Sequence, residues 1–288
     1  MVNYSSLKRY IKNSELRIVN DDLKVRLSKE LALKYDNGSY NIFLEKMNGS
    51  IGEIKSIGIK YPGNAKPIFY IYIVPDDNFI ELLNFPHKNA KQGGRPVPSY
   101  DIKGFDLALG ISSNVCENSS DRVSISMTVN FIHELAHLVS GNFFYTNRFI
   151  EEGFAETLPL YTLDYESKFD MHRNLIKNMK PEDFYSAKEL IEMSKNNDFW
   201  MGRLIPNTSC TFNLACISSY LFVRGCMEKI ALKYNLNRKE ATQKFLEIVK
   251  YSNNLETLLV FDIAHEIDID EEQLLNGKEI QINIIERL

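Results

Sequence analysis

Two histidines four residues apart, inside an apolar helical stretch, constrain this chain more than any other feature. Residues 124–141 read SISMTVNFIHELAHLVSG, a run with a broad apolar surface that ends at Gly141, a residue typical of helix C-termini. His133 and His137 are therefore predicted one turn apart on one helix face, where both imidazoles can reach a single ion. Glu134 can reach the same cleft and act on a water bound to that ion.

A buried histidine pair satisfied by neighbouring acids is the alternative interpretation of these five residues. The chain holds only five histidines, and a chance H-E-x-x-H is expected in about one protein in a hundred of this size and composition. A second, acidic motif follows at residues 148–156, RFIEEGFAE. Zinc in hydrolases takes three protein ligands and keeps one position for water, so a third donor is required and this motif offers candidates.

HELAH followed by FIEEGFAE resembles the gluzincin zinc metallopeptidases of the peptidase MA-like superfamily, whose second helix carries an E-G-x-A-E-like motif. The resemblance covers mainly residues 124–163 and is specific to the superfamily, not to one member. It implies a zincin-like α+β fold, one Zn²⁺ ion, and hydrolysis of peptide bonds in a peptide or protein substrate.

Two rules select different glutamates as the third zinc ligand. The spacing familiar from aminopeptidases places eighteen residues between the second histidine, His137, and the ligand, and so selects Glu156. The motif places the ligand directly before Gly-x-Ala and selects Glu152, and we follow it because loop lengths between helices vary freely. Glu156, one turn further on the same face, is then expected to accept the free N–H of His133 and orient that imidazole. Glu151 is interpreted as a surface acid.

The remaining chemical roles also follow from the resemblance. Glu134 is the expected general base, which takes a proton from the zinc-activated water and later delivers it to the leaving amine. The oxyanion needs a further donor, commonly Tyr or His in this superfamily, and the candidates are Tyr161, Tyr165, His172, Tyr185 and Tyr220.

The helix predicted over residues 211–234 bears on that choice. It resembles the Y-x-x-A-G-S-F helix that faces the site in many gluzincin-like peptidases, but Phe212 stands at the Tyr position and Cys216 at the Gly position. Tyr220 is therefore a candidate donor for which core packing is an equally good interpretation.

The segments before the motif predict a small mixed β-sheet with flanking helices. Residues 1–50 are expected to be mainly helical, and residues 55–60 and 67–74 are rich in β-branched and aromatic residues, hence strands. Asp76 and Asp77 are expected to lead into a short helix at 78–85. Residues 88–98, KNAKQGGRPVP, are expected to form a polar loop.

A further strand is predicted at residues 105–111, FDLALGI. In gluzincin-like folds a strand of this kind borders the cleft, and its free edge can pair with an extended peptide. The resemblance therefore implies substrate-backbone contacts at Leu107, Ala108, Leu109 and Gly110.

Helices are predicted for most of the chain after the motif, including one over 181–195 and one or two over 211–234, interrupted near Gly225. The predicted architecture is α+β, with an α/β part at residues 1–120 and a mainly helical part at 121–288. These two parts are expected to form one continuous catalytic unit with the zinc cleft between them.

Composition excludes several classes of protein. The net charge of −4 and the pI near 5.8 argue against a nucleic-acid binder. The first residues form no apolar signal segment, and no run approaches the roughly 18 apolar residues of a membrane span, so a cytoplasmic protein is expected. The four cysteines show no C-x-x-C spacing, so neither a cysteine zinc site nor a structural disulfide is predicted. Oligomeric state is left open.

Three alternatives to an endopeptidase or dedicated processing enzyme stay open. An aminopeptidase needs an acidic anchor for the substrate amine, and no such motif is evident upstream of His133. A catalytically silent binding or regulatory protein, or a protein with a closed structural zinc site, would keep the scaffold without turnover. The intact Glu134 argues against both, because neither needs a base at that position.

Overall fold

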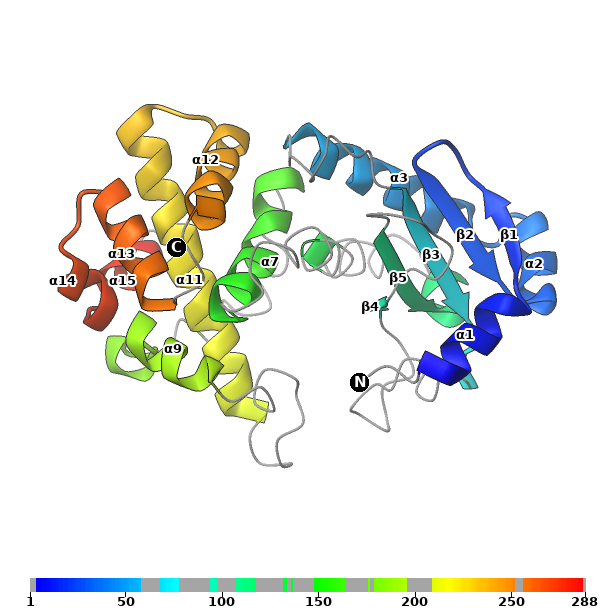
Figure 1. Ribbon diagram of the computed structural model, residues 1–288, viewed down its shortest axis with the longest axis horizontal. Coiled ribbons are helices and arrows are strands. Elements are labelled where there is room, and N and C mark those ends of the chain that lie inside the picture. The colour runs from blue at the N-terminus through cyan, green and yellow to red at the C-terminus, as the bar shows by residue number, and fades with distance from the viewer. Residues whose placement is uncertain are drawn as a thin grey trace. The chain divides into compact units, whose positions relative to one another are not determined.

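The chain folds into two compact units, Met1–Lys55 with Ile59–Val139, and Ser56–Gly58 with Ser140–Leu288. This computed structural model describes residues 4–57, 68–77, 94–97, 107–117, 132–133, 136, 148–163, 176, 179–195, 209–251 and 256–286. The first unit carries a mixed sheet and the second is built from helices, so the chain is α+β as predicted (Figure 1). The division falls after residue 139 and not at 120, so His133 belongs to the unit with the sheet.

The sheet of the first unit has five strands in the order β1-β2-β3-β5-β4. β2 pairs in parallel with β3, and β3 with β5, whereas the two outer strands, β1 and β4, pair antiparallel with their neighbours. Every residue of β3 is buried, as expected for a central strand covered on both faces. The strands are β1 (Glu15–Ile18), β2 (Leu23–Leu27), β3 (Phe69–Val74), β4 (Gly94–Val97) and β5 (Leu107–Ser112).

The prediction that residues 1–50 are mainly helical is wrong for β1 and β2. In β2, Leu23, Val25 and Leu27 are buried and the residues between them are half-buried, which is the period of two that a strand requires. The helices of this region are α1 (Tyr4–Lys12), α2 (Lys29–Asp36) and α3 (Asn41–Ser56).

Two further predictions are wrong at the boundaries of this unit. Lys55 and Ser56, expected to begin a strand, end α3, because the buried Met47, Ile51 and Ile54 continue a helical spacing up to them. Residues 94–97, expected to lie in a loop, form β4, whose proline is tolerated because β4 is an outer strand. The strands predicted at 67–74 and 105–111 are confirmed as β3 and β5, within a few residues.

The second unit is organised around α11 (Ser209–Tyr234), shown in yellow in Figure 1, which packs against α7, α9, α12 and α15. It is one continuous helix, so the predicted interruption near Gly225 is wrong. A Cβ at Gly225 would overlap Ile280 of α15, so the glycine marks a close helix contact. The other helices are α7 (Arg148–Leu163), α9 (Ala187–Ser194), α12 (Arg238–Tyr251), α13 (Glu256–Glu266), α14 (Glu271–Asn276) and α15 (Glu279–Ile285).

The helix predicted over 181–195 is split into a 3-10 turn, η2 (Pro181–Asp183), and α9. Pro181 occupies the first turn as predicted. The break arises because Ser186 caps α9: its hydroxyl accepts from the Glu189 amide, and the Glu189 carboxylate accepts from the Ser186 amide.

Within the described part of the chain, no helix combines the length and the apolarity that crossing a membrane requires. Three cysteines with described side chains, Cys116, Cys216 and Cys226, are buried and unbridged.

Candidate functional site

The H-E-x-x-H segment is described at three positions. Ile132, His133 and Ala136 are helical, in agreement with the predicted helix, whereas Glu134 and His137 lie outside the described residues. Ile132 and Ala136, four residues apart and hence on one face, are fully buried, and His133 is half-buried. The helix therefore packs through its Ile132 face and leaves the His133 imidazole partly accessible, as a ligand must be.

The second motif forms α7; between residues 148 and 158 its apolar side chains are buried, while two of its glutamates stay half-buried. Glu152 and Glu156 lie four residues apart on one helix, as predicted, and so share a face. The fully buried residues of α7 are Phe149, Ile150, Phe154, Ala155, Thr157 and Leu158.

Glu151 is not the surface acid that the sequence indicated. Its exposed fraction is 6%, and its carboxylate accepts from the Arg148 guanidinium one turn earlier, at 2.7 Å. A carboxylate that is taken out of water requires such a partner. Glu151 therefore anchors the start of α7, while Glu152 is the more accessible of the two adjacent acids.

The glycine of the E-G-F-A-E motif lets α7 approach α11 closely. A Cβ on Gly153 would overlap the carbonyl oxygen of Ser219 and lie 2.6 Å from Cγ2 of Val223. Only glycine fits this crossing, because the first obstacle is backbone and cannot rotate away. The crossing fixes the position of Glu152 and Glu156 along α11, relative to the residues next to Ser219.

Tyr220, next to that crossing, is 5% exposed and hydrogen-bonded within α11. Nη1 of Arg224 donates to its hydroxyl oxygen at 2.7 Å, and Nε of Arg224 donates to Glu228 at 2.8 Å. The guanidinium carbon also lies 5.8 Å from the Tyr220 ring centroid. These three side chains are spaced four residues apart and form one stripe along the helix.

Burial raises the pKa of Tyr220 to about 12, while the charge and hydrogen bond of Arg224 act in the opposite direction. The negative charge of Glu156 adds to the increase, which places the Tyr220 hydroxyl within electrostatic reach of α7. Tyr220 is therefore a neutral O–H at neutral pH. Its ring also packs in an apolar cluster with Ile176, Phe184, Ile217, Leu221 and Ile284.

The other oxyanion candidates are less defined. Tyr161 lies in α7, but its side chain is outside the described part, as are Tyr165 and His172 entirely. Tyr185 is half-buried before α9; its amide donates to Ser218 of α11 at 3.1 Å, and its carbonyl accepts from Gln281 of α15 at 3.1 Å. These contacts anchor the backbone at Tyr185.

The strand expected to contact substrate has no free edge. β5 pairs with β3 on one side and with β4 on the other, where Ala108 lies opposite Val97 and Gly110 opposite Arg95. The expectation of an open edge is therefore wrong at Ala108, Leu109 and Gly110, while the residue that would lie opposite Leu107 is outside the described residues. Among the described strands the open edge on this side of the sheet belongs to β4. The sequence missed β4 because four residues with Gly and Pro show no strand pattern.

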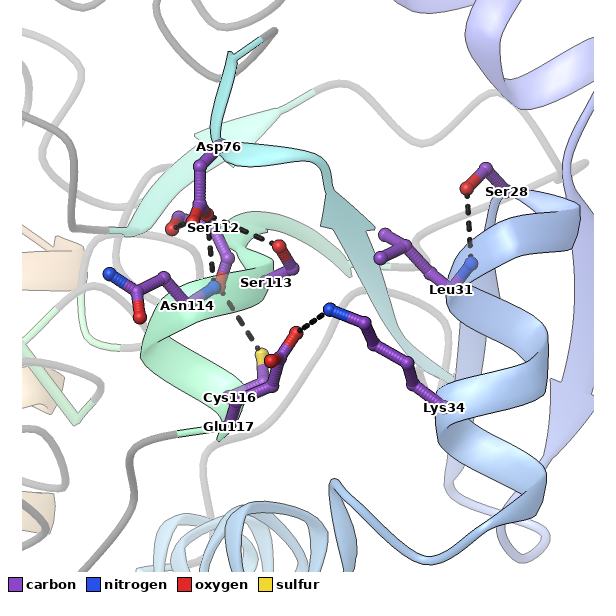
Figure 2. Close-up of polar contacts among 9 residues, drawn as sticks. All are labelled: Ser28, Leu31, Lys34, Asp76, Ser112, Ser113, Asn114, Cys116 and Glu117. Carbon is purple, nitrogen blue, oxygen red and sulfur yellow. Dashed lines mark hydrogen bonds and ion pairs between the residues drawn. The ribbon is translucent and has the colours of Figure 1, made fainter.

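A polar cluster that the sequence did not predict joins the C-terminal ends of β3 and β5 (Figure 2). Oδ1 of Asp76 accepts from the Ser112 hydroxyl at 2.6 Å, from the Ser113 hydroxyl at 3.2 Å and from the Asn114 amide at 2.9 Å. The last two residues begin α5 (Ser113–Glu117). The helix expected at 78–85 lies outside the described residues. The Asp76 carboxylate instead accepts hydrogen bonds from residues at the start of α5.

Among the residues that the structure describes, no three His, Cys, Asp or Glu side chains form a group that could hold a metal ion. His137, one of the three predicted ligands, is outside that set, and the other two, His133 and Glu152, belong to different units. The donors themselves, two imidazoles and one carboxylate, match the ligand chemistry of zinc.

No protein-family model matches the chain, and comparisons with curated proteins and with solved structures give no match either.

Proposed function

We propose that this protein is a zinc-dependent peptidase with a zincin-like fold, acting as an endopeptidase or a dedicated processing enzyme. One observation carries the proposal: the H-E-x-x-H motif, whose His133 is helical and half-buried, is followed by a second helix on which Glu152 and Glu156 share a half-buried face. A histidine pair kept only for core packing does not require this second, acidic helix.

His133, His137 and Glu152 are the residues proposed to hold zinc. When bound there, zinc supplies a Lewis acid that polarises the scissile carbonyl and lowers the pKa of water. His133 and Glu152 are both half-buried, which suits residues that are held by packing but face a cleft. Glu156 is proposed to accept the second N–H of His133 and fix its tautomer.

Glu134 is the proposed general base and acid. Its carboxylate takes the proton of the attacking water and passes it to the leaving amine, which converts a poor leaving group into a neutral one. The residue follows a zinc-binding histidine directly, so one helix positions both groups.

Tyr220 is the candidate oxyanion donor that the described residues support best. A hydroxyl with a pKa of about 12 keeps its proton at neutral pH, and Arg224 already donates to its oxygen. A tyrosine hydroxyl that keeps its proton can act as a donor to an oxyanion. Tyr161 on α7 is the second candidate. Substrate backbone pairing, first expected at β5, is proposed for the outer edge of β4.

The decisive experiment compares wild type with Glu134→Gln for hydrolysis of a mixed peptide library and for zinc content. Loss of a general base costs about 10²- to 10⁴-fold in rate, while the ligands and hence the bound zinc stay unchanged. Glu272→Gln, an exposed acid on α14, is the matched control and should retain full activity. Equal activity of wild type and Glu134→Gln would end the assignment.

The same measurements separate the alternatives. Bound zinc without turnover of any peptide favours a binding or regulatory protein. Release of single N-terminal residues only, from otherwise intact peptides, indicates an aminopeptidase. Cleavage within blocked peptides supports the proposed endopeptidase.

A further inference from the structure

β1, an outer strand of the sheet, carries two exposed apolar side chains on one face. Leu16 and Ile18 are 38% and 68% exposed, whereas Glu15 and Arg17, which alternate with them, lie on the opposite face. No described strand pairs with the outer side of β1. An exposed apolar edge of this kind is a template for a further strand.

The hydrogen-bond pattern between β1 and β2 shows which backbone groups of β1 face outward. The amide of Val19 donates to the Leu23 carbonyl of the β2 segment at 3.0 Å, so the odd-numbered residues of β1 point toward β2. Successive residues alternate in direction, and the N–H and C=O groups of Leu16 and Ile18 therefore point away from the sheet. The Ser14 amide is already donated to Ile11, which limits a new pairing to a short stretch around Leu16.

The charges of β1 select a partner for that stretch. If a second β1 pairs antiparallel with Leu16 opposite Leu16, each Glu15 lies opposite Arg17 of the other copy, in the pair that is not hydrogen-bonded and has the shorter spacing. Only a shift by two residues keeps the outward backbone groups of the two strands facing each other. Such a shift places Arg17 opposite Arg17, or Glu15 opposite Glu15, and like charges directly opposite are destabilising. Only the register centred on Leu16 satisfies both the outward backbone groups and the charges.

We propose that the outer edge of β1 is a self-association surface, on which a second copy of this chain adds its own β1 antiparallel about a two-fold axis through Leu16. The two sheets then continue into one another, and Leu16 and Ile18 are covered. Arg17 already contacts Asp36 of α2 and Glu15 of its own strand, and its five N–H donors allow it to keep Asp36 while bonding to the other copy's Glu15.

The surface is small, so the dimer is expected to be weak, with a Kd on the order of 10⁻⁵ to 10⁻⁴ M. Sedimentation velocity of the full chain from about 1 to 300 µM covers this range. Wild type should shift from monomer to dimer as concentration rises. Glu15→Arg and Arg17→Glu each convert two opposite-charge pairs into two like-charge pairs and should raise the Kd about tenfold or more.

Mixing the two charge variants gives the sharpest result. In a mixed dimer the new arginine of one chain lies opposite the new glutamate of the other, and the remaining pair is unchanged. An equimolar mixture should therefore recover a dimer of near wild-type Kd that neither variant forms alone. Asp36→Ala removes the contact of Arg17 with α2 but leaves both pairs between chains, so it should dimerise as wild type does.

Leu16→Pro tests the backbone part independently. The Leu16 amide faces outward, so its loss removes no β1–β2 hydrogen bond, but it removes the central bonds of the new pairing. Circular dichroism verifies folding of each variant. A wild type that stays monomeric, a dimer that resists these substitutions, or a mixture that fails to recover would each overturn the proposal.

Discussion

Tyr220 is buried beside the Arg224 guanidinium, and burial and this cation act on the pKa of Tyr220 in opposite directions. Burial has the larger effect and raises the pKa to about 12, and the Arg224 guanidinium limits the increase. Burial likewise raises the pKa of Tyr10 and of Tyr40. Each of these phenols is neutral in the folded chain at a pH where the unfolded chain begins to ionise.

This difference predicts how stability depends on pH in the alkaline range. The contribution of neutral Tyr220 is fully present below pH 10 and is lost as pH rises from 10 to 12, because only the unfolded chain releases the proton there. The slope is about 1.4 kcal/mol per pH unit for this group. Urea unfolding of Tyr220→Phe at pH 9 and 11 should show a shallower loss than wild type. Tyr234→Phe, at an exposed position, serves as control.

Asp76 is a second residue with a defined role, and its removal should destabilise the sheet unit. Three donors, one from the end of β5 and two from the start of α5, converge on one oxygen (Figure 2). Asp76→Ala leaves them without this acceptor and should cost about 2–4 kcal/mol of unfolding free energy, measured by urea titration. Asp76→Asn keeps an acceptor oxygen of the same shape, so its loss should be clearly smaller. Equal losses would show that the charge, not the acceptor, is what matters.

At the scale of secondary-structure elements, the contact between α7 and α11 determines where the acidic motif lies. The glycine that separates Glu152 from Phe154 is the point of closest approach to α11. Phe154 stacks on Phe245 of α12, with ring centroids 6.4 Å apart, so α7 is packed on both sides of the motif. The E-G-F-A-E segment therefore has a packing role at the α7–α11 contact in addition to its proposed role in metal binding.

Gly153→Ala should therefore destabilise the helical unit. The added Cβ meets a backbone carbonyl, and overpacking of this kind costs about 1–3 kcal/mol. Gly52→Ala on α3 is the matched control, since nothing lies within 4 Å of its added Cβ. It should be neutral or stabilise by about 0.5–1 kcal/mol, because alanine favours a helix interior. Thermal unfolding of both variants checks the contrast, and a harmless Gly153→Ala would contradict the packing argument.

At the scale of the whole molecule, the proposed zinc ligands come from both units: His133 lies in the sheet unit and Glu152 in the helical unit. Each unit has its own buried core, from Leu23 and Ile71 in one to Phe154 and Leu221 in the other. His133 and Glu152 are half-buried and belong to neither apolar core, so folding of each unit is expected to proceed without a metal.

Removal of metal should consequently abolish activity before it affects folding. Treatment with a strong chelator is expected to eliminate peptide hydrolysis while the far-ultraviolet circular dichroism stays unchanged, and added zinc should restore turnover. The melting temperature should fall by no more than the loss of one bound ligand explains. Global unfolding on chelation would instead point to a structural zinc site.

The elements that the sequence predicted well are those with a strong local period. α7 follows from its motif and apolar spacing, α11 from its long apolar run apart from the predicted interruption, and β3 from its run of β-branched and aromatic residues. The errors lie in strands whose formation depends on pairing with other strands. β1 and β2 are short strands that pair with each other, β2 also pairs with β3, and β4 exists because β5 provides a partner.

The candidate site divides in the same way. Sequence alone determined that His133 is helical, that Glu152 and Glu156 share one helix face, and that α+β is the fold class, because each depends on spacing along the chain. Only the tertiary structure decided that Glu151 is buried against Arg148, that β5 has no free edge, and that Arg224 donates to Tyr220. Strand partners come from residues distant in sequence. The pairs Arg148–Glu151 and Tyr220–Arg224 are each one helical turn apart, but how deeply they are buried depends on the elements packed around them.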